Sequence, residues 1–157
     1  LSEKKVIVFA THGLMAGDLP RLLEPALAMS ADGSELKNAL SPLLTLEDVL
    51  GLKLNADWVV LSACNTAAAD GKGEEALSGL ARGFFYAGGR SLLVTHWAVE
   101  SNSAKELTTR TFMHFTQFPN APKSESLREA MLQVMADPRY GHPAFWAPYA
   151  LVGDSLR

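Results

Sequence analysis

The order of apolar and amphipathic segments predicts an α/β protein with an open, mostly parallel sheet and helices on both faces. Apolar runs at residues 5–10, 58–64, 91–97 and 149–152 alternate along the chain with segments of helical periodicity. The first run is apolar at nearly every position, which is typical of a parallel strand covered on both faces. Strands that alternate with helices in this way form open α/β sheets.

The segment between the first two strands is expected to be irregular. Pro20 and Pro25 argue against a long helix within residues 14–30. Residues 26–30 are typical of a short strand that enters a turn, and residues 34–44 are expected to form a loop.

The first helix is expected to begin after Thr45. Asp48 follows Thr45 by three residues, which is the spacing of a capping box, and Gly51 is the expected stop. Residues 67–73, which follow the next strand, are small or polar and are expected to form a flexible loop.

The second helix is expected over residues 74–87, with Gly88 ending it. Gly79 and Gly83 lie inside this helix, where each glycine costs about 1 kcal/mol relative to alanine. We therefore expect another strand or helix to approach the backbone closely at these positions.

Two more helices are expected before the last strand. Ser103 and Glu106 have the spacing of a second capping box, for a helix that extends to about residue 118. The other covers residues 124–136, and Pro138 follows its end.

Composition indicates one globular domain over residues 1–157. The chain is 48% hydrophobic and 20% charged, with a formal net charge of −3, so neither a nucleic-acid partner nor an acidic membrane surface is expected. No apolar run is long enough to span a bilayer. The single cysteine excludes an internal disulfide and favours a reducing, cytoplasmic location. Because an apolar strand starts almost at residue 1 and a central strand needs two neighbours, we expect the domain to be incomplete on its N-terminal side.

Three chemically capable side chains follow apolar strands directly. His12, Cys64 and His96 each stand at the carboxyl end of a strand, where open α/β sheets place their reactive crevice. A nearby imidazole can take the proton of a thiol and stabilise the thiolate, which is the nucleophilic form. The backbone N–H groups of Gly13 and Cys64 could donate to an oxyanion.

The residues alone leave alternatives open. Cys64 could be an inert buried cysteine, since cysteine is among the most buried residue types. Spacing does not choose between His12 and His96 as the partner of the thiol, although His96 with Trp97 also suits the wall of a substrate cleft. His114 falls within an expected helix, where a surface or packing role is expected rather than a chemical one.

Other chemistries have little support. No pair of cysteine and histidine shows the short spacing of zinc ligands, so no metal site is expected. The chain has neither a phosphate-binding loop nor the G-x-S-x-G turn of serine hydrolases. No cofactor is expected.

The ordered motifs resemble those of CHAT domains, which are caspase- and separase-like cysteine peptidases often fused to tetratricopeptide (TPR) repeats. The resemblance runs along nearly the whole chain and is carried by residues 9–13, 46–50, 56–66, 79–88, 96–99 and 146–154. It implies a caspase-like sheet that lacks the family's upstream strands. It also implies a cysteine endopeptidase acting on protein or peptide substrates, with regulation by partner domains and a TPR region upstream.

By this resemblance, His12 matches the catalytic histidine and Cys64 the nucleophile, with the N–H groups of Gly13 and Cys64 as the oxyanion hole. His96, Trp97 and Glu100 are expected in the substrate cleft. The residues after Trp97 depart from the family's pattern, so a cleavage preference cannot be transferred. A catalytically silent scaffold or signalling module is the alternative function, and a thiol hydrolase or transferase for small molecules is a third.

Overall fold

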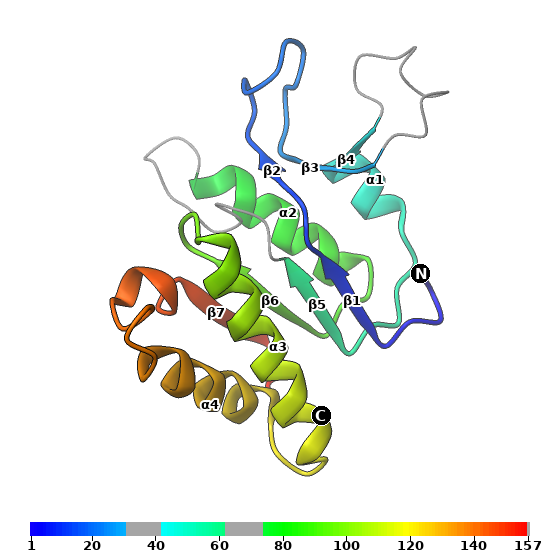
Figure 1. The fold of residues 1–157 in the computed structure, drawn as a ribbon. Helices are drawn as coiled ribbons and strands as arrows, with labels where there is room; N and C mark the ends of the chain where they lie inside the picture. Colours follow the sequence, from blue (N-terminus) through cyan, green and yellow to red (C-terminus); the bar gives the residue numbers. More distant parts are fainter. Residues whose placement is uncertain (31–41, 62–73, 157) are drawn as a thin grey trace.

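The centre of the molecule is a four-stranded sheet in the order β1-β5-β6-β7 (Figure 1). The computed structural model describes residues 1–30, 42–61 and 74–156. The strands of this sheet are β1 (Val6–Phe9), β5 (Trp58–Leu61), β6 (Ser91–Thr95) and β7 (Tyr149–Gly153). β1, β5 and β6 are parallel, and β7 is antiparallel to β6. The predicted α/β fold with a mostly parallel sheet is confirmed.

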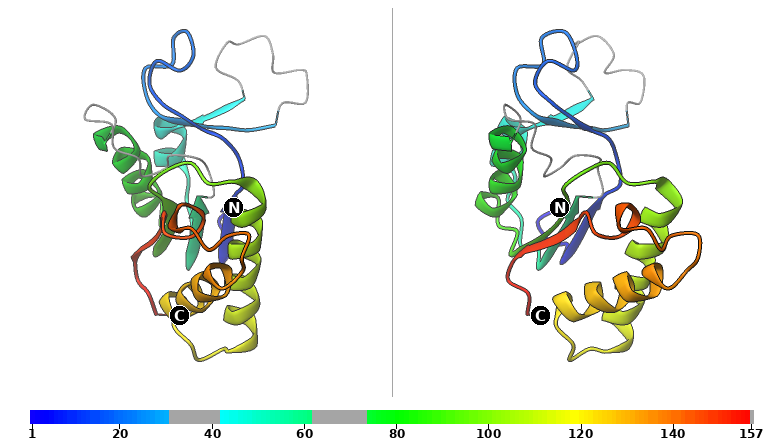
Figure 2. Two further views of the ribbon diagram at one scale, coloured as in Figure 1. Left: turned by 60° about the vertical axis from the view of Figure 1, so that its left-hand side comes forward. Right: turned by 90° about the vertical axis from the view of Figure 1, so that its left-hand side faces the viewer.

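Helices cover both faces of this sheet, as predicted (Figure 2). One face is covered by α1 (Leu46–Gly51) and α2 (Glu74–Tyr86), and the other by α3 (Ser101–Gln117) and α4 (Lys123–Met135). In β5, Val59 belongs to the core beneath α1 and α2, whereas Trp58 belongs to the core beneath α3 and α4. None of the helices in the described ranges is long and apolar enough to cross a membrane.

β1 is covered on one face only, which corrects the expectation that both faces are buried. Ile7 and Phe9 are buried in the core beneath α2, but Val6 and Val8 are 39% and 46% exposed on the other face. Within the part of the chain that the structure describes, β1 pairs with β5 alone. The physical reason is its place at the edge of the sheet, where α3 covers the next strand more fully than it covers β1.

A second, smaller sheet follows β1. It has the antiparallel order β2-β3-β4 and consists of β2 (Gly13–Leu14), β3 (Ala26–Ala28) and β4 (Leu43–Thr45). The predicted short strand at residues 26–30 is confirmed, as is the absence of a long helix before it. The expected loop over residues 34–44 is wrong at Leu43 and Leu44, which pair with β3. Residues 34–41 of that segment lie outside the described residues.

α1 begins where the capping box was predicted. The Asp48 N–H donates to Thr45 Oγ1 at 3.3 Å, and the Thr45 N–H donates to Asp48 Oδ2 at 2.9 Å. These two bonds satisfy donors that the first turn of a helix leaves free. The helix ends at Gly51, as expected.

α1 packs against α2 through Gly83. A Cβ atom at Gly83 would lie 2.8 Å from Leu46 Cδ1 and 3.2 Å from Val49 Cγ1. The predicted close approach therefore occurs at Gly83, whereas a Cβ atom at Gly79 would make only an ordinary contact of 3.8 Å with Leu46. α2 ends as predicted, because Gly88 adopts a φ of 108° that residues with side chains rarely adopt.

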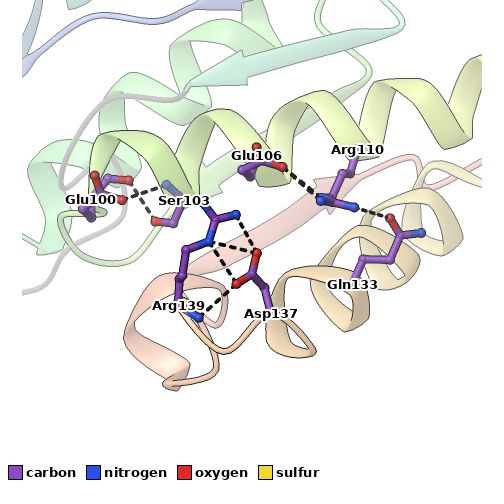
Figure 3. A network of polar contacts seen from close by, with 7 residues as sticks. All are labelled: Glu100, Ser103, Glu106, Arg110, Gln133, Asp137 and Arg139. Atoms are coloured by element: carbon purple, nitrogen blue, oxygen red, sulfur yellow. Dashed lines mark hydrogen bonds and ion pairs between the residues drawn. The ribbon is translucent and has the colours of Figure 1, made fainter.

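Polar side chains tie α3 to α4, and a further ion pair lies within the segment after α4 (Figure 3). Arg110 donates from Nε to Glu106 Oε2 at 3.1 Å and from Nη1 to Gln133 Oε1 at 3.0 Å, which joins the two helices. Just beyond α4, Arg139 donates to the Asp137 carboxylate and lowers the pKa of Asp137 to about 2. These contacts lie on the side of the sheet opposite α1 and α2.

We predict opposite effects for alanine at the two glycines of α2. Gly83→Ala lowers the free energy of unfolding by about 1–2 kcal/mol, because overpacking outweighs the roughly 1 kcal/mol gained in helix propensity. Gly79→Ala, the matched control, raises it by about 0.5–1 kcal/mol. Chemical denaturation of both variants checks this, and equal stabilisation by the two substitutions would contradict the described packing of α1 on α2.

Candidate active site

His12 lies three residues beyond the end of β1, at the carboxyl edge of the main sheet. Its imidazole is exposed, and its backbone is held by β3 of the small sheet. The Ala28 N–H donates to the His12 carbonyl at 2.9 Å, and the hydroxyl of Thr11 donates to the Ala28 carbonyl. The chain thus leaves one sheet at Phe9 and joins the other at Gly13, with His12 between them.

The N–H group of Gly13 faces the outer edge of the small sheet. Gly13 is paired with Leu27, and the flanking bond from Ala28 to His12 identifies this as a non-hydrogen-bonded pair. In such a pair the backbone groups point away from the partner strand. Since β2 is the end strand of the small sheet, the Gly13 N–H is oriented where a ligand atom could accept from it.

Cys64 lies outside the described residues, but the strand that precedes it is described. β1 and β5 pair in parallel with Phe9 opposite Leu61. His12 follows Phe9 by three residues, and Cys64 follows Leu61 by three residues. The three-residue segments that lead to His12 and to Cys64 therefore start at the ends of two adjacent, paired strands.

β6 flanks β5 on its other side, so the strands of His12 and His96 border the strand that leads to Cys64. The His96 N–H donates to the Pro148 carbonyl at 2.9 Å, and the imidazole is exposed. Trp97 is 41% exposed, and its Nε1–H donates to the Ala144 carbonyl at 3.2 Å. The segment after β6 is therefore anchored to the chain that leads into β7, with both side chains at the surface.

The segment of His96 and Trp97 thus follows the strand that lies next to β5. Its role as a wall of the substrate cleft stays a prediction.

Glu100 is the N-cap of α3, which corrects the prediction that Ser103 and Glu106 cap this helix. Its carboxylate accepts from the N–H groups of Asn102 at 2.9 Å and Ser103 at 2.8 Å. These backbone bonds lower the pKa of Glu100 below its ordinary value. The Ser103 hydroxyl instead donates to the Glu100 carbonyl, and Glu106 binds Arg110 within the helix. The carboxylate expected in the substrate cleft is thus engaged in capping.

An open groove of about 470 Å³ runs between β1 and α3, with His12 in its wall. Its apolar lining includes Val8 and Ala104, and Lys105 contributes a charged side chain. Thr11 also lines the groove, next to His12. The exposed face of β1 and the imidazole of His12 therefore border one continuous depression.

The remaining histidines have structural contacts. His114 Nδ1 lies 3.1 Å from Ser126 Oγ, and its ring packs on Phe118 at 4.6 Å between centroids, so packing is the one of its two expected roles that the structure shows. His142 Nδ1 accepts from the Ala144 N–H at the start of a short 3₁₀ helix, Pro143–Phe145. Among the described residues, no group of three or more His, Cys, Asp and Glu is arranged to hold a metal ion.

Sequence reasoning missed the attachment of His12 to β3. The short strand at 26–30 was expected, but nothing in its composition indicates that it pairs with residues just after His12. The polar residue Thr11 between an apolar strand and His12 was the one available signal. Its hydroxyl contact with Ala28 is visible only in the folded chain.

Comparisons with known proteins give a consistent relationship. A family model of the CHAT domain matches residues 1–154. Tetratricopeptide repeat protein 28 of Mus musculus is 35% identical over 122 residues, which cover 73% of this chain and 5% of that protein. Tetratricopeptide repeat protein 28 of Homo sapiens is 31% identical over 118 residues, covering 73% of this chain and 4% of that protein. The chain therefore spans only a small part of these relatives.

We predict a pH-dependent role for the carboxylate of Glu100. A lowered pKa in the folded state means that its contribution to stability is present above the ordinary carboxyl pKa of about 4.3 and is lost as the pH falls through the folded value. Glu100→Ala therefore lowers the melting temperature at pH 7, and the difference from wild type shrinks below about pH 4.

Glu100→Gln is the matched control, since its amide oxygen can still accept from one backbone N–H but carries no charge. Its melting temperature should fall less than that of Glu100→Ala at pH 7. A difference between wild type and Glu100→Ala that stays constant from pH 7 to pH 3 would argue against the capping carboxylate.

Proposed function

Because the chain belongs to the CHAT domain family, we propose that it is a cysteine endopeptidase domain in which His12 and Cys64 form the catalytic dyad. The observation that carries the proposal is the parallel pairing of Phe9 with Leu61. Because of this pairing, the two three-residue segments that lead to His12 and Cys64 begin at the ends of adjacent strands. The substrate would be a protein or peptide, and no cofactor is needed for the chemistry.

The proposed reaction begins with transfer of the Cys64 proton to the imidazole of His12. The thiolate attacks the carbonyl carbon of the scissile peptide bond, and the carbonyl oxygen becomes an oxyanion. His12 then gives the proton to the leaving amine as the C–N bond breaks, which leaves a thioester on Cys64. In the second half, His12 takes a proton from water as the water oxygen attacks the thioester carbon. The C–S bond then breaks, the acid product leaves, and the protonated His12 returns the proton to the Cys64 thiolate.

Two backbone N–H groups are proposed to stabilise the oxyanion, from Gly13 and Cys64. The outward orientation of the Gly13 N–H in β2 supports the first assignment. A positioned donor of this kind is worth about 10²- to 10³-fold in rate when it contacts the developing charge. Trp97, held by Ala144, is proposed to line the substrate cleft together with His96.

A second function, an interaction module, is favoured by the outer edge of β1. The register with β5 directs the N–H and C=O groups of Val6 and Val8 away from β5, toward that edge. Their side chains are also partly exposed.

We propose that a further strand from an upstream region completes the domain on this edge. We also propose that this region carries tetratricopeptide repeats, as the names of the relatives indicate for those proteins. The single cysteine fits a cytoplasmic protein.

We predict that covalent labelling by an electrophilic peptide probe requires both dyad residues. Cys64→Ala abolishes labelling, and His12→Ala slows it by about 10²- to 10⁴-fold, the usual contribution of a general acid–base group. His96→Ala is the comparison from the opposite flanking strand: since His96 is proposed to line the cleft but not to take the proton, the rate should fall much less than in His12→Ala. The rates are measured by mass spectrometry, and equal labelling of wild type and His12→Ala would contradict the dyad.

We also predict that the edge of β1 contributes to binding of the upstream repeat region. Val8→Glu weakens the association by about tenfold, or about 1.4 kcal/mol, because it places an unpaired charge at an apolar contact. Val152→Glu on β7 is the control, because Val152 is equally exposed, at 46%, on the opposite edge. Titration calorimetry measures both affinities, and equal loss in the two variants would argue against the β1 edge.

A further inference from the structure

Thr11 is the residue that connects the candidate catalytic histidine to the small sheet. It stands between Ala10 and His12, beyond the last paired residue of β1, and its side chain is half-buried. Its hydroxyl donates to the Ala28 carbonyl, and the Ala28 N–H donates to the His12 carbonyl at 2.9 Å. Both polar groups of the Ala28 backbone are therefore engaged by the two residues at this junction.

Ala28, to which Thr11 and His12 are bonded, is itself held in place by the small sheet. Ala28 is in β3, where it pairs with Leu43 of β4, and the following Met29 N–H donates to the Pro42 carbonyl at 2.8 Å. Leu27 next to it is fully buried. β4 continues directly into the capped helix α1, so Ala28 is part of a backbone that two neighbouring elements fix in place.

The imidazole of His12, by contrast, has no buried surroundings to fix it. The side chain is exposed, and its backbone has left the regular hydrogen bonding of β1. The direction of its Cα–Cβ bond consequently depends on how residues 11 and 12 are attached to β3. A displacement of about 1 Å at a reacting group can reduce a rate by 10²-fold.

We propose that Thr11 is a positioning residue, whose hydroxyl bond to Ala28 fixes the backbone of His12 in the orientation that the dyad requires. The inference rests on the proposed peptidase function, because it assigns a role to a neighbour of its general base. Thr11 takes no part in proton transfer in this account. Its effect is exerted through the geometry of His12.

The test uses an isosteric pair of variants. Thr11→Val keeps the size of the side chain and removes the hydroxyl, whereas Thr11→Ser keeps the hydroxyl and removes the methyl group. The rate of Cys64 alkylation is measured from pH 5 to pH 9 by mass spectrometry. We expect Thr11→Val to slow alkylation at neutral pH by about 10- to 100-fold and to move the midpoint of the profile to higher pH. Thr11→Ser should stay within about threefold of wild type.

A second measurement separates positioning from folding and from the dyad itself. In the Cys64→Ala background, NMR couplings that depend on the backbone dihedral angle φ report the conformation of His12 without any thiol chemistry. We expect the wild-type couplings where the hydroxyl is kept, as in Thr11→Ser, and shifted or averaged couplings in Thr11→Val and Thr11→Ala. If His12→Ala leaves alkylation unchanged, the proposed function fails, and these couplings still decide the positioning claim.

Two results would overturn the proposal. The first is a Thr11→Val profile that superimposes on that of wild type, with unchanged couplings of His12. The second is a loss in Thr11→Ser as large as that in Thr11→Val, which would show that keeping the hydroxyl does not keep His12 in place. If Thr11→Val does not fold, Thr11→Ala against Thr11→Ser provides the same comparison.

Discussion

The parallel pairing of β1 with β5 is the constraint on which the rest of this structure depends. It places Phe9 opposite Leu61, so the segments leading to His12 and Cys64 begin at neighbouring points on one edge of the sheet. The pairing is maintained by burial: Ile7 and Phe9 pack beneath α2, and β5 is buried on both faces. Slippage by one residue would replace Ile7 and Phe9 on the buried face with Val6 and Val8, whose smaller side chains would fill the core beneath α2 less completely.

The small sheet and α1 hold the chain that follows β1, which carries His12 and Gly13. β2 receives the chain directly after His12, β3 holds it through Ala28, and β4 leads into α1. α1 then packs on α2 at Gly83. Because α2 also covers β1 and β5, packing contacts connect the main sheet, the small sheet, α1 and α2 around His12. A substitution at Gly83, although distant in sequence from His12, therefore alters the packing of the elements that surround His12.

Much of the fold could be predicted from local patterns, and the errors have physical causes. The capping box at Thr45 was predictable because both partners lie within four residues of each other. The start of α3 was not, because Glu100 is an uncommon N-cap residue and the more typical Ser103 lies three positions later. The two-residue strand β2 carries no periodicity of its own, so its pairing with β3 depends on contacts distant in sequence. Likewise, the strand that ends before His12 could be predicted from its apolar run. The attachment of His12 to β3 through Thr11 could not.

The central claim is that His12, and not His96, serves the thiol of Cys64. A crystal structure of the protein bound covalently at Cys64 to a peptide aldehyde tests this most directly. The account predicts that a ring nitrogen of His12 lies within about 4 Å of Sγ, close to hydrogen-bond reach, with the hemithioacetal oxygen accepting from the Gly13 N–H. A structure in which His96 occupies that position, or in which His12 lies beyond reach of both Sγ and the inhibitor, would contradict it.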